Sequence, residues 1–162
     1  MKKGKSNPLA KTVATKKAAT KKAAGPPLPV LPKIERRRSP VHRFGVFALE
    51  PIPKNKRIVP YLGEKITNAE SSEREDRYLQ KGRIWCFKLN NRWVIDAGVG
   101  GSVARFINHS CEPNCYSQIV DGTIWIRAGR NIRTGEELSY NYNTDGHGRI
   151  QCLCRPGCRG RI

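Results

Sequence analysis

The chain has 162 residues and a formal net charge of +18 at pH 7. This length accommodates one domain of ordinary size and a tail. No apolar run approaches the ~20 residues of a membrane span, and the lysines at the N-terminus are not followed by the apolar segment of a secretory signal. We therefore expect an intracellular, reducing location and no membrane partner. The six cysteines then indicate metal ligands or buried thiols rather than disulfides.

The positive charge is concentrated at the N-terminus. Residues 1–38 contain nine Lys, three Arg and one Glu, a net +11. Residues 15–24 read Thr-Lys-Lys-Ala-Ala twice, and four prolines follow between Gly25 and Pro32. This composition cannot form a core, so we expect a disordered Lys/Ala-rich tail and a stiff proline-rich linker over 1–38. Such a tail favours non-specific binding to DNA phosphates; an inert solubilising extension is the alternative.

From Ser39 onward the pattern favours β-structure. The ranges Phe44–Leu49 and Arg57–Tyr61 are predicted strands. One helix is predicted over 68–80, because Thr67 and Glu70 can form a capping box and a Lys-Gly pair follows.

The second half of the chain carries hairpin signals. Trp85–Leu89 and Trp93–Asp96 flank an Asn-Asn pair, and Gln118–Val120 and Thr123–Ala128 flank an Asp-Gly pair. A last strand is expected within Glu136–Tyr142. Short strands with frequent turn signals predict a mainly β fold of small sheets with one short helix.

Three motifs carry the chemistry. Arg105–Cys115 reads RFINHSCEPNC, Glu136–Tyr142 reads EELSYNY, and Cys152–Cys158 reads CLCRPGC. Their order and spacing closely resemble the SET-domain protein-lysine methyltransferases with a zinc-binding post-SET tail, over roughly Ser39 to Arg161. The resemblance implies a SET fold of small curved sheets over 39–145, a zinc-stapled post-SET segment over 146–162, and a C-terminal pseudoknot in which the end of the chain threads the Asn-His loop.

Methyl transfer from S-adenosylmethionine (SAM) needs little acid–base apparatus, because the sulfonium is already an activated leaving group. The protein must align a neutral amine with the methyl group and exclude water, and an aromatic channel that desolvates lysine favours its neutral form. Tyr140 and Tyr142 suit this task. The resemblance makes Tyr142 the catalytic tyrosine and Tyr140 the position whose hydroxyl holds a water and restricts the methylation state of the product. By pattern alone, Tyr-Asn-Tyr is one face of a strand.

The resemblance also implies a cofactor site. Asn108 and His109 match the pair that holds the cofactor, and Leu153 is a candidate to cover the adenine. The remaining expected cofactor contacts are His42, Phe44, Gly45, Trp85, Arg105 and Phe106.

Three positions depart from the family pattern. Arg43 replaces the first glycine of Gly-x-Gly, Trp85 stands where tyrosine is more usual, and Ser102 stands where asparagine is usual. Losing a glycine restricts the backbone beside the cofactor, so weakened binding or a pseudo-enzyme is an alternative.

The cysteines indicate a metal. Cys152, Cys154 and Cys158 supply three thiolates, and a closed tetrahedral zinc site needs four. Spacing leaves Cys111 and Cys115 as candidates for the fourth. The resemblance selects Cys111, which leaves Cys115 and Cys86 as expected buried thiols.

These features together predict SAM-dependent methylation of lysine in a histone or histone-like protein, with one structural Zn²⁺. The tail would hold the enzyme on DNA, in chromatin or in a bacterial nucleoid. Two alternatives are a catalytically weak DNA- or chromatin-associated binding protein and a lysine methyltransferase of a non-chromatin basic protein. The sequence leaves the oligomeric state open.

Overall fold

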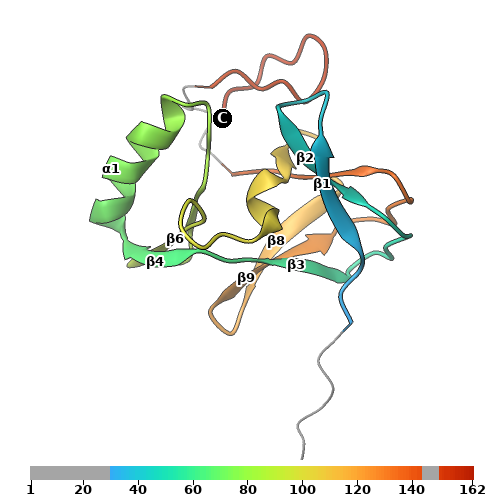
Figure 1. Ribbon diagram of the computed structural model, residues 1–162, viewed down its shortest axis with the longest axis horizontal. Helices are drawn as coiled ribbons and strands as arrows, with labels where there is room; N and C mark the ends of the chain where they lie inside the picture. The colour runs from blue at the N-terminus through green and yellow to red at the C-terminus, as the bar shows by residue number, and fades with distance from the viewer. Residues whose placement is uncertain (1–29, 144–149) are drawn as a thin grey trace, which may run out of the picture.

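The computed structural model describes residues 30–143 and 150–162 (Figure 1). Its first half contains β1 (Ile34–Arg38), β2 (Phe44–Ala48), β3 (Arg57–Tyr61), β4 (Glu64–Thr67), α1 (Asn68–Leu79), β5 (Cys86–Lys88) and β6 (Trp93–Asp96). Its second half contains the 3₁₀ turn η1 (Val103–Phe106), β7 (Asn108–His109), β8 (Cys115–Val120), β9 (Thr123–Ala128) and β10 (Glu137–Tyr140). The prediction of a mainly β fold with one short helix is confirmed.

The strands form three small sheets. Their orders are β1-β2-β10-β7, β3-β9-β8 and β4-β6-β5. Helix α1 lies against β4 and β6 at one end of the molecule, as Figure 1 shows. Both predicted hairpins are present, since β5 pairs with β6 and β8 pairs with β9 in antiparallel register.

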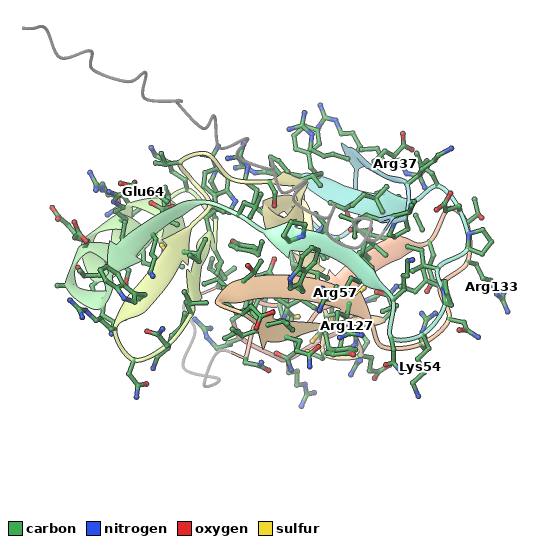
Figure 2. All side chains as sticks on the ribbon, turned by 90° about the horizontal axis from the view of Figure 1, so that it is seen from below. Arg37, Lys54, Arg57, Glu64, Arg127 and Arg133 are labelled. Atoms are coloured by element: carbon green, nitrogen blue, oxygen red, sulfur yellow. The ribbon has the colours of Figure 1, made fainter. Side chains whose placement is uncertain are left out.

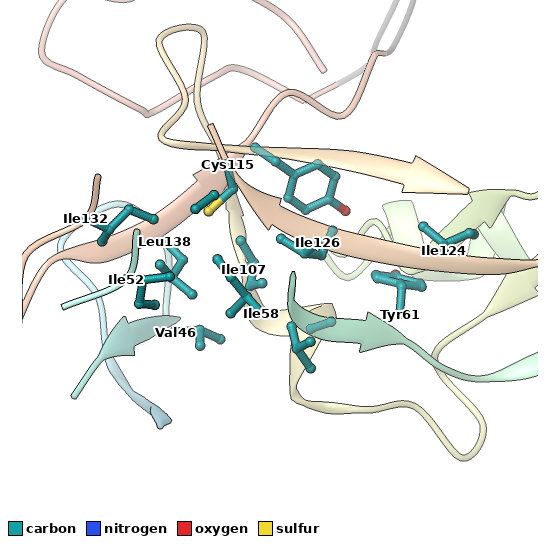
Figure 3. Packing of buried hydrophobic residues seen from close by; sticks show 14 of the residues in the cluster. Val46, Ile52, Ile58, Tyr61, Ile107, Cys115, Ile124, Ile126, Ile132 and Leu138 are labelled. Atoms are coloured by element: carbon teal, nitrogen blue, oxygen red, sulfur yellow. The ribbon is translucent and has the colours of Figure 1, made fainter. Parts of the chain in front are cut away.

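The core joins the first two sheets. Val46 of β2, Ile58 of β3, Ile126 of β9 and Leu138 of β10 are all essentially inaccessible to solvent, and Figure 3 shows them packed around Ile107. Ile107 directly precedes β7. The same apolar contacts that stabilise the sheets therefore position the Asn-His strand.

Helix α1 begins with the predicted capping box. The Thr67 hydroxyl accepts a hydrogen bond from the Glu70 N–H, and the Glu70 carboxylate accepts one from the Thr67 N–H at 2.8 Å. Further along the helix, Arg74 contacts the fully buried Asp96 at 2.8 Å, and Tyr78 donates to the same carboxylate. These two contacts hold α1 against β6.

Among the described residues, no helix is long and apolar enough to cross a membrane.

Strand β10 lies between two segments that are distant in the sequence. It pairs antiparallel with β2 and parallel with β7, placing Ser139 opposite Asn108 and Tyr140 opposite His109. Strand β10, which leads into the C-terminal segment, is thus held against the Asn-His loop. This is the pseudoknot that the resemblance implied.

Two turns of this fold have the same backbone arrangement. They span residues 51–58 and 131–138, and they meet at an isolated bridge between Ile52 and Ile132. Each isoleucine N–H donates to the carbonyl of the other at 2.9 Å.

Each turn also donates a backbone hydrogen bond to the strand that precedes the other turn. The Asn55 N–H donates to the Ala128 carbonyl at 2.8 Å, and the Gly135 N–H donates to the Ala48 carbonyl at 2.7 Å. Both turn residues have positive φ, 67° for Asn55 and 83° for Gly135, which asparagine and glycine tolerate best. The two turns are therefore related by a local twofold in their backbone hydrogen bonds.

Strand β1 corrects one prediction. The charge and composition of residues 1–38 predict a disordered tail, yet residues 34–38 pair along their full length with β2. The guanidinium of Arg36 lies 4.8 Å from the Phe44 ring and that of Arg37 lies 3.9 Å from the Phe47 ring. Cation–π contacts thus stabilise a basic edge strand.

The repeat at 15–24 lies outside the described residues. The division between the two domains at residue 145 stays a prediction.

Candidate active site and metal centre

A cavity of about 370 Å³ lies where the start of β2, the turn after α1, the η1–β7 segment and the C-terminal segment meet. This volume is within the usual range of small-molecule sites. Most of the expected cofactor and catalytic residues line it: His42, Phe44, Trp85, Arg105, Phe106, Asn108, His109, Tyr142 and Leu153. Gly45 and Tyr140 do not line it.

Aromatic rings and guanidinium groups form one wall of the cavity. Phe44 and Phe106 meet edge to face at 6.3 Å. The guanidinium of Arg36 lies 4.8 Å from both rings, and that of Arg105 lies 5.1 Å from the Trp85 ring. One Arg105 nitrogen donates to a backbone carbonyl, whereas its buried Nε has no partner among the described residues. This wall can stack on a ring and offer a donor to an anionic group.

A polar network holds the Asn108 side chain. Its amide nitrogen donates to Glu137 at 2.8 Å and to the Phe44 carbonyl at 3.0 Å, and Ser39 donates to the same carboxylate at 2.9 Å. A Cβ atom at Gly45 would lie 2.1 Å from a Glu137 oxygen. Gly45 thus makes room for the network, and its role as a cofactor contact stays a prediction.

Tyr142 is fixed by its hydroxyl and its backbone. The hydroxyl donates to the Ile107 carbonyl at 2.8 Å, and the backbone N–H donates to Nδ1 of His109 at 3.3 Å. Burial raises the pKa of Tyr142, so the phenol is neutral in the physiological range.

Tyr140 belongs to a buried aromatic cluster next to Tyr142. Its ring lies 4.8 Å from that of Tyr142 and is stacked on Phe87 at 5.9 Å. Tyr61 packs edge to face on Phe87 at 5.1 Å and donates its hydroxyl to the Trp85 carbonyl at 2.9 Å. Burial raises the pKa of both Tyr61 and Tyr140.

Sequence reasoning missed several members of this site. Tyr61 and Phe87 carry only the weak signal of aromatics in strands. Glu137 lies in the EELSYNY motif, where only the tyrosines carry a signal for the reaction. Arg36 lies in the segment whose charge predicts a tail. Ser102, the third departure from the family pattern, instead caps η1 and donates to the Pro60 carbonyl at 2.7 Å.

His109 connects the tyrosine to the cysteines. Because Nδ1 accepts the Tyr142 N–H, the proton of the neutral imidazole resides on Nε2, which lies 3.5 Å from the Cys111 sulfur. Burial lowers the pKa of His109 and so favours this neutral form. Hydrogen bonds from neighbouring residues orient metal ligands, and this imidazole N–H is placed to donate to the Cys111 sulfur.

The four predicted metal ligands converge. The sulfur atoms of Cys111, Cys152, Cys154 and Cys158 all lie within 4.8 Å of one another. The Cys111 sulfur is 3.8 Å from those of Cys152 and Cys158. Tetrahedral zinc with Zn–S bonds of ~2.3 Å sets sulfur atoms about 3.8 Å apart, so this cluster could hold Zn²⁺.

The two remaining cysteines lie outside the cluster. Burial raises the pKa of both Cys86 and Cys115 to about 12, so both are protonated thiols. This agrees with the choice of Cys111 over Cys115 as the fourth ligand.

Arg43 has the backbone conformation of a glycine. Its φ is 43°, in the left-handed region, and its side chain lines the cavity. The backbone that Gly-x-Gly would provide is therefore retained, at a cost in strain.

Comparison with known proteins agrees with this geometry. A family model described as the SET domain matches residues 43–143. The chain is 44% identical over 134 residues to the histone-lysine N-methyltransferase, H3 lysine-4 specific, of Kluyveromyces lactis, covering 76% of this chain and 13% of that protein. It is 42% identical over 136 residues to the protein of the same name in Candida albicans, covering 77% and 13%. The chain thus spans about an eighth of the length of these relatives.

Two solved structures share the fold. One is ctPRC2 in an autoinhibited conformation bound to S-adenosylmethionine, with a TM-score of 0.64, 28% identity, and coverage of 70% of this chain and 15% of that chain. The other is a humanized mutant of the Chaetomium thermophilum Polycomb Repressive Complex 2, with a TM-score of 0.62, 30% identity and the same coverage.

Replacing Arg43 with glycine should stabilise the protein. A left-handed non-glycine residue costs ~1–2 kcal/mol, and the greater freedom of glycine in the unfolded chain returns part of that. We expect Arg43→Gly to raise the melting temperature by about 2–4 °C. Arg92→Gly, at an exposed position without positive φ, should not raise it. An equal effect of both changes in a thermal melt would contradict the strain at Arg43.

The cysteine cluster should bind one zinc ion per chain. Metal analysis of freshly purified protein tests this, and less than about a tenth of an equivalent would contradict it. Cys158→Ser should lower zinc content and increase hydrogen exchange in residues 150–162, which line both the cluster and the cavity. Exchange in β3, β8 and β9 should stay unchanged. Cys86→Ser is the matched control and should retain the metal.

Proposed function

Because the chain belongs to the SET-domain family, we propose that it transfers methyl groups from SAM to lysine side chains of a histone. The observation that carries this proposal is the position of Tyr142, which contacts both the cavity and the buried aromatic cluster. Support for the reaction comes from relatives named histone-lysine N-methyltransferase and from a fold neighbour described with bound SAM.

SAM supplies the activated methyl group when bound in the cavity. The η1–β7 segment would hold it from one side, through Arg105, Phe106 and the Asn108–His109 pair. His42, Phe44, Trp85 and Leu153 would enclose it. The Asn108 amide is already oriented by Glu137 and Ser39, so little side-chain freedom is lost on binding.

The target lysine would enter among Tyr61, Phe87, Tyr140 and Tyr142. These rings exclude water and favour the neutral amine, which is the form that attacks the methyl carbon. The lysine ammonium would first give its proton to solvent water. The lone pair of the neutral amine would then form the new N–C bond as the S–C bond breaks, and the neutral thioether S-adenosylhomocysteine would leave. The Tyr142 hydroxyl donates its proton in a hydrogen bond to the Ile107 carbonyl. The lone pairs of the Tyr142 oxygen therefore remain available to the reacting groups.

One observation favours a second candidate. The strained Arg43 beside the cavity is consistent with weakened cofactor binding and thus with a chromatin-associated binding protein of low activity. Measuring SAM affinity separates the two, because the binding protein does not require it. The other alternative is a lysine methyltransferase of a non-chromatin basic protein. A substrate panel that includes non-histone basic proteins tests it.

The relatives also bear on location. Fungal histone methyltransferases act on a chromatin protein by name, so we infer that this protein associates with chromatin. They give no support to the bacterial nucleoid.

The activity is tested by incubating the protein with labelled SAM and a histone panel, then mapping the modified residue by mass spectrometry. Tyr142→Phe should lower turnover by a factor of about 10² or more. Its SAM affinity should stay within a few fold of the parent. Tyr116→Phe, on an exposed strand, is the matched control and should keep full turnover. Parental activity in Tyr142→Phe would show that another residue performs this role.

The product should be mainly mono- or dimethyl-lysine. The Tyr140 hydroxyl, in the aromatic cluster, would hold a water and limit the room for a further methyl group. Tyr140→Phe should therefore shift the products toward higher methylation in a mass spectrum. Tyr61→Phe removes a neighbouring hydroxyl that is bonded to the Trp85 carbonyl and should leave the product distribution unchanged. Abundant trimethyl-lysine from the unmutated enzyme would contradict the prediction.

Residues 1–38 should bind duplex DNA without sequence preference, because they carry a net +11. Replacing Lys16, Lys17, Lys21 and Lys22 with glutamine should weaken DNA binding and reduce its salt dependence by about three to four units of log–log slope. The rate on a short free peptide should not change. Equal DNA affinity before and after this substitution, in an electrophoretic titration, would exclude the tail as a DNA contact.

A further inference from the structure

A second basic region lies on the folded part of the chain, away from the cavity. It is formed by Lys54, Lys56, Arg57, Arg127 and Arg133, which we call the basic turn surface. None of these residues lines the cavity. They come from the 51–58 turn, from β9 and from the 131–138 turn. Figure 2 labels four of them, from Arg57 and Arg127 near the centre of the view to Lys54 and Arg133 on its right.

The charges of this surface have no carboxylate partner among residues 30–143 and 150–162. Arg57 and Arg127 are directly opposite each other in the β3–β9 pair, an arrangement that like charges disfavour. Arg127 donates to the neutral Asn55 carbonyl, and Arg57 lies over the Trp125 ring at 5.2 Å. Across the described residues, no carboxylate forms an ion pair with any member of the surface.

The local twofold shows that the fold does not require these cations. Superposing the two turns through Ile52 and Ile132 matches a basic set with a neutral and acidic one: Lys54 with Thr134, Lys56 with Glu136, and Arg57 with Glu137. Both turns nevertheless make the same backbone hydrogen bonds. The backbone hydrogen bonds are thus compatible with either sign of charge. Arg130 forms an ion pair with Glu136, whereas Lys56 has no carboxylate partner among the described residues.

The basic tail joins the folded part beside this surface. The Lys33 carbonyl accepts the Leu49 N–H at 2.9 Å, and the Lys33 N–H donates to Glu50 at 3.2 Å. Residue 51 begins the basic turn. Residues 1–29 contribute eight lysines and no acidic residue to the sequence that precedes this point. A polyanion bound by the tail is therefore brought next to the basic turn surface.

We propose that the basic turn surface is a second binding site for the phosphate backbone of duplex DNA, separate from both the tail and the cavity. A protein partner normally requires an apolar interface core, whereas a phosphate backbone requires only cations spaced along a surface. Phosphates placed between Arg57 and Arg127 would also relieve their mutual repulsion. The site would orient the folded domain on DNA that the tail has captured.

The test uses the full chain and exchanges residues for those of the twofold-related turn. The variant Lys54→Thr with Lys56→Glu lowers the net charge by three. The control, Lys81→Thr with Lys88→Glu, makes the same charge change at two exposed positions on the α1 side. Both are titrated with a fluorescent 24-base-pair duplex over a range of salt concentrations.

The surface variant should bind the duplex at least about fivefold more weakly at ~0.1 M salt, with a log–log salt slope smaller by about two. The control should stay within about twofold. Both variants should melt like the parent and methylate a short free peptide at the parental rate. Equal loss of duplex affinity in the two variants would show that only net charge matters and would contradict the proposed site. An unchanged duplex affinity of the surface variant would also contradict it. Tighter, equally mutation-sensitive binding of a poly-glutamate peptide would assign the surface to an acidic protein instead.

Discussion

The insertion of β10 between β2 and β7 is the constraint on which the rest of the structure depends. Its short parallel register with β7 sets Tyr140 opposite His109. That register brings the backbone of Tyr142 to the His109 imidazole and its ring beside the cavity. The buried Leu138, packed against Val46 and Ile107, stabilises the insertion by apolar burial. Tyr142, the proposed catalytic tyrosine, thus occupies a fixed position relative to a loop some thirty residues earlier.

The same loop couples the cavity to the cysteine cluster. His109 contacts Tyr142 through one ring nitrogen and approaches Cys111 through the other. Cys152 and Leu153 line the cavity, while Cys152 also belongs to the cluster. A metal in the cluster would therefore close the cavity and orient the imidazole in one step. Thiolate ligation contributes to folding of the segment that carries it, and residues of that segment also line the cavity.

Arginine has two roles in this protein. In β1 and around the cavity, guanidinium groups stack on aromatic rings and act as parts of the packed structure. On the basic turn surface, Arg57 and Arg127 face each other with no carboxylate partner among the described residues. The twofold-related turn has the same backbone hydrogen bonds with acidic residues at the matching positions. The arginines that pack on aromatic rings can thus be distinguished from those whose charge remains available to a partner.

Local signals in the sequence determined the elements whose causes are local. The capping box at Thr67, the Asp-Gly and Asn-Asn hairpins and the spacing of the four cysteines were all predictable, because each depends on a few neighbouring residues or on a recognised motif. Tertiary structure alone decided that the arginines of β1 form a strand and that Gly45 makes room for Glu137 against Asn108. It also decided that Tyr61 and Phe87 belong to the site. These features arise from contacts between segments far apart in the chain, whose energy exists only once the sheets have packed.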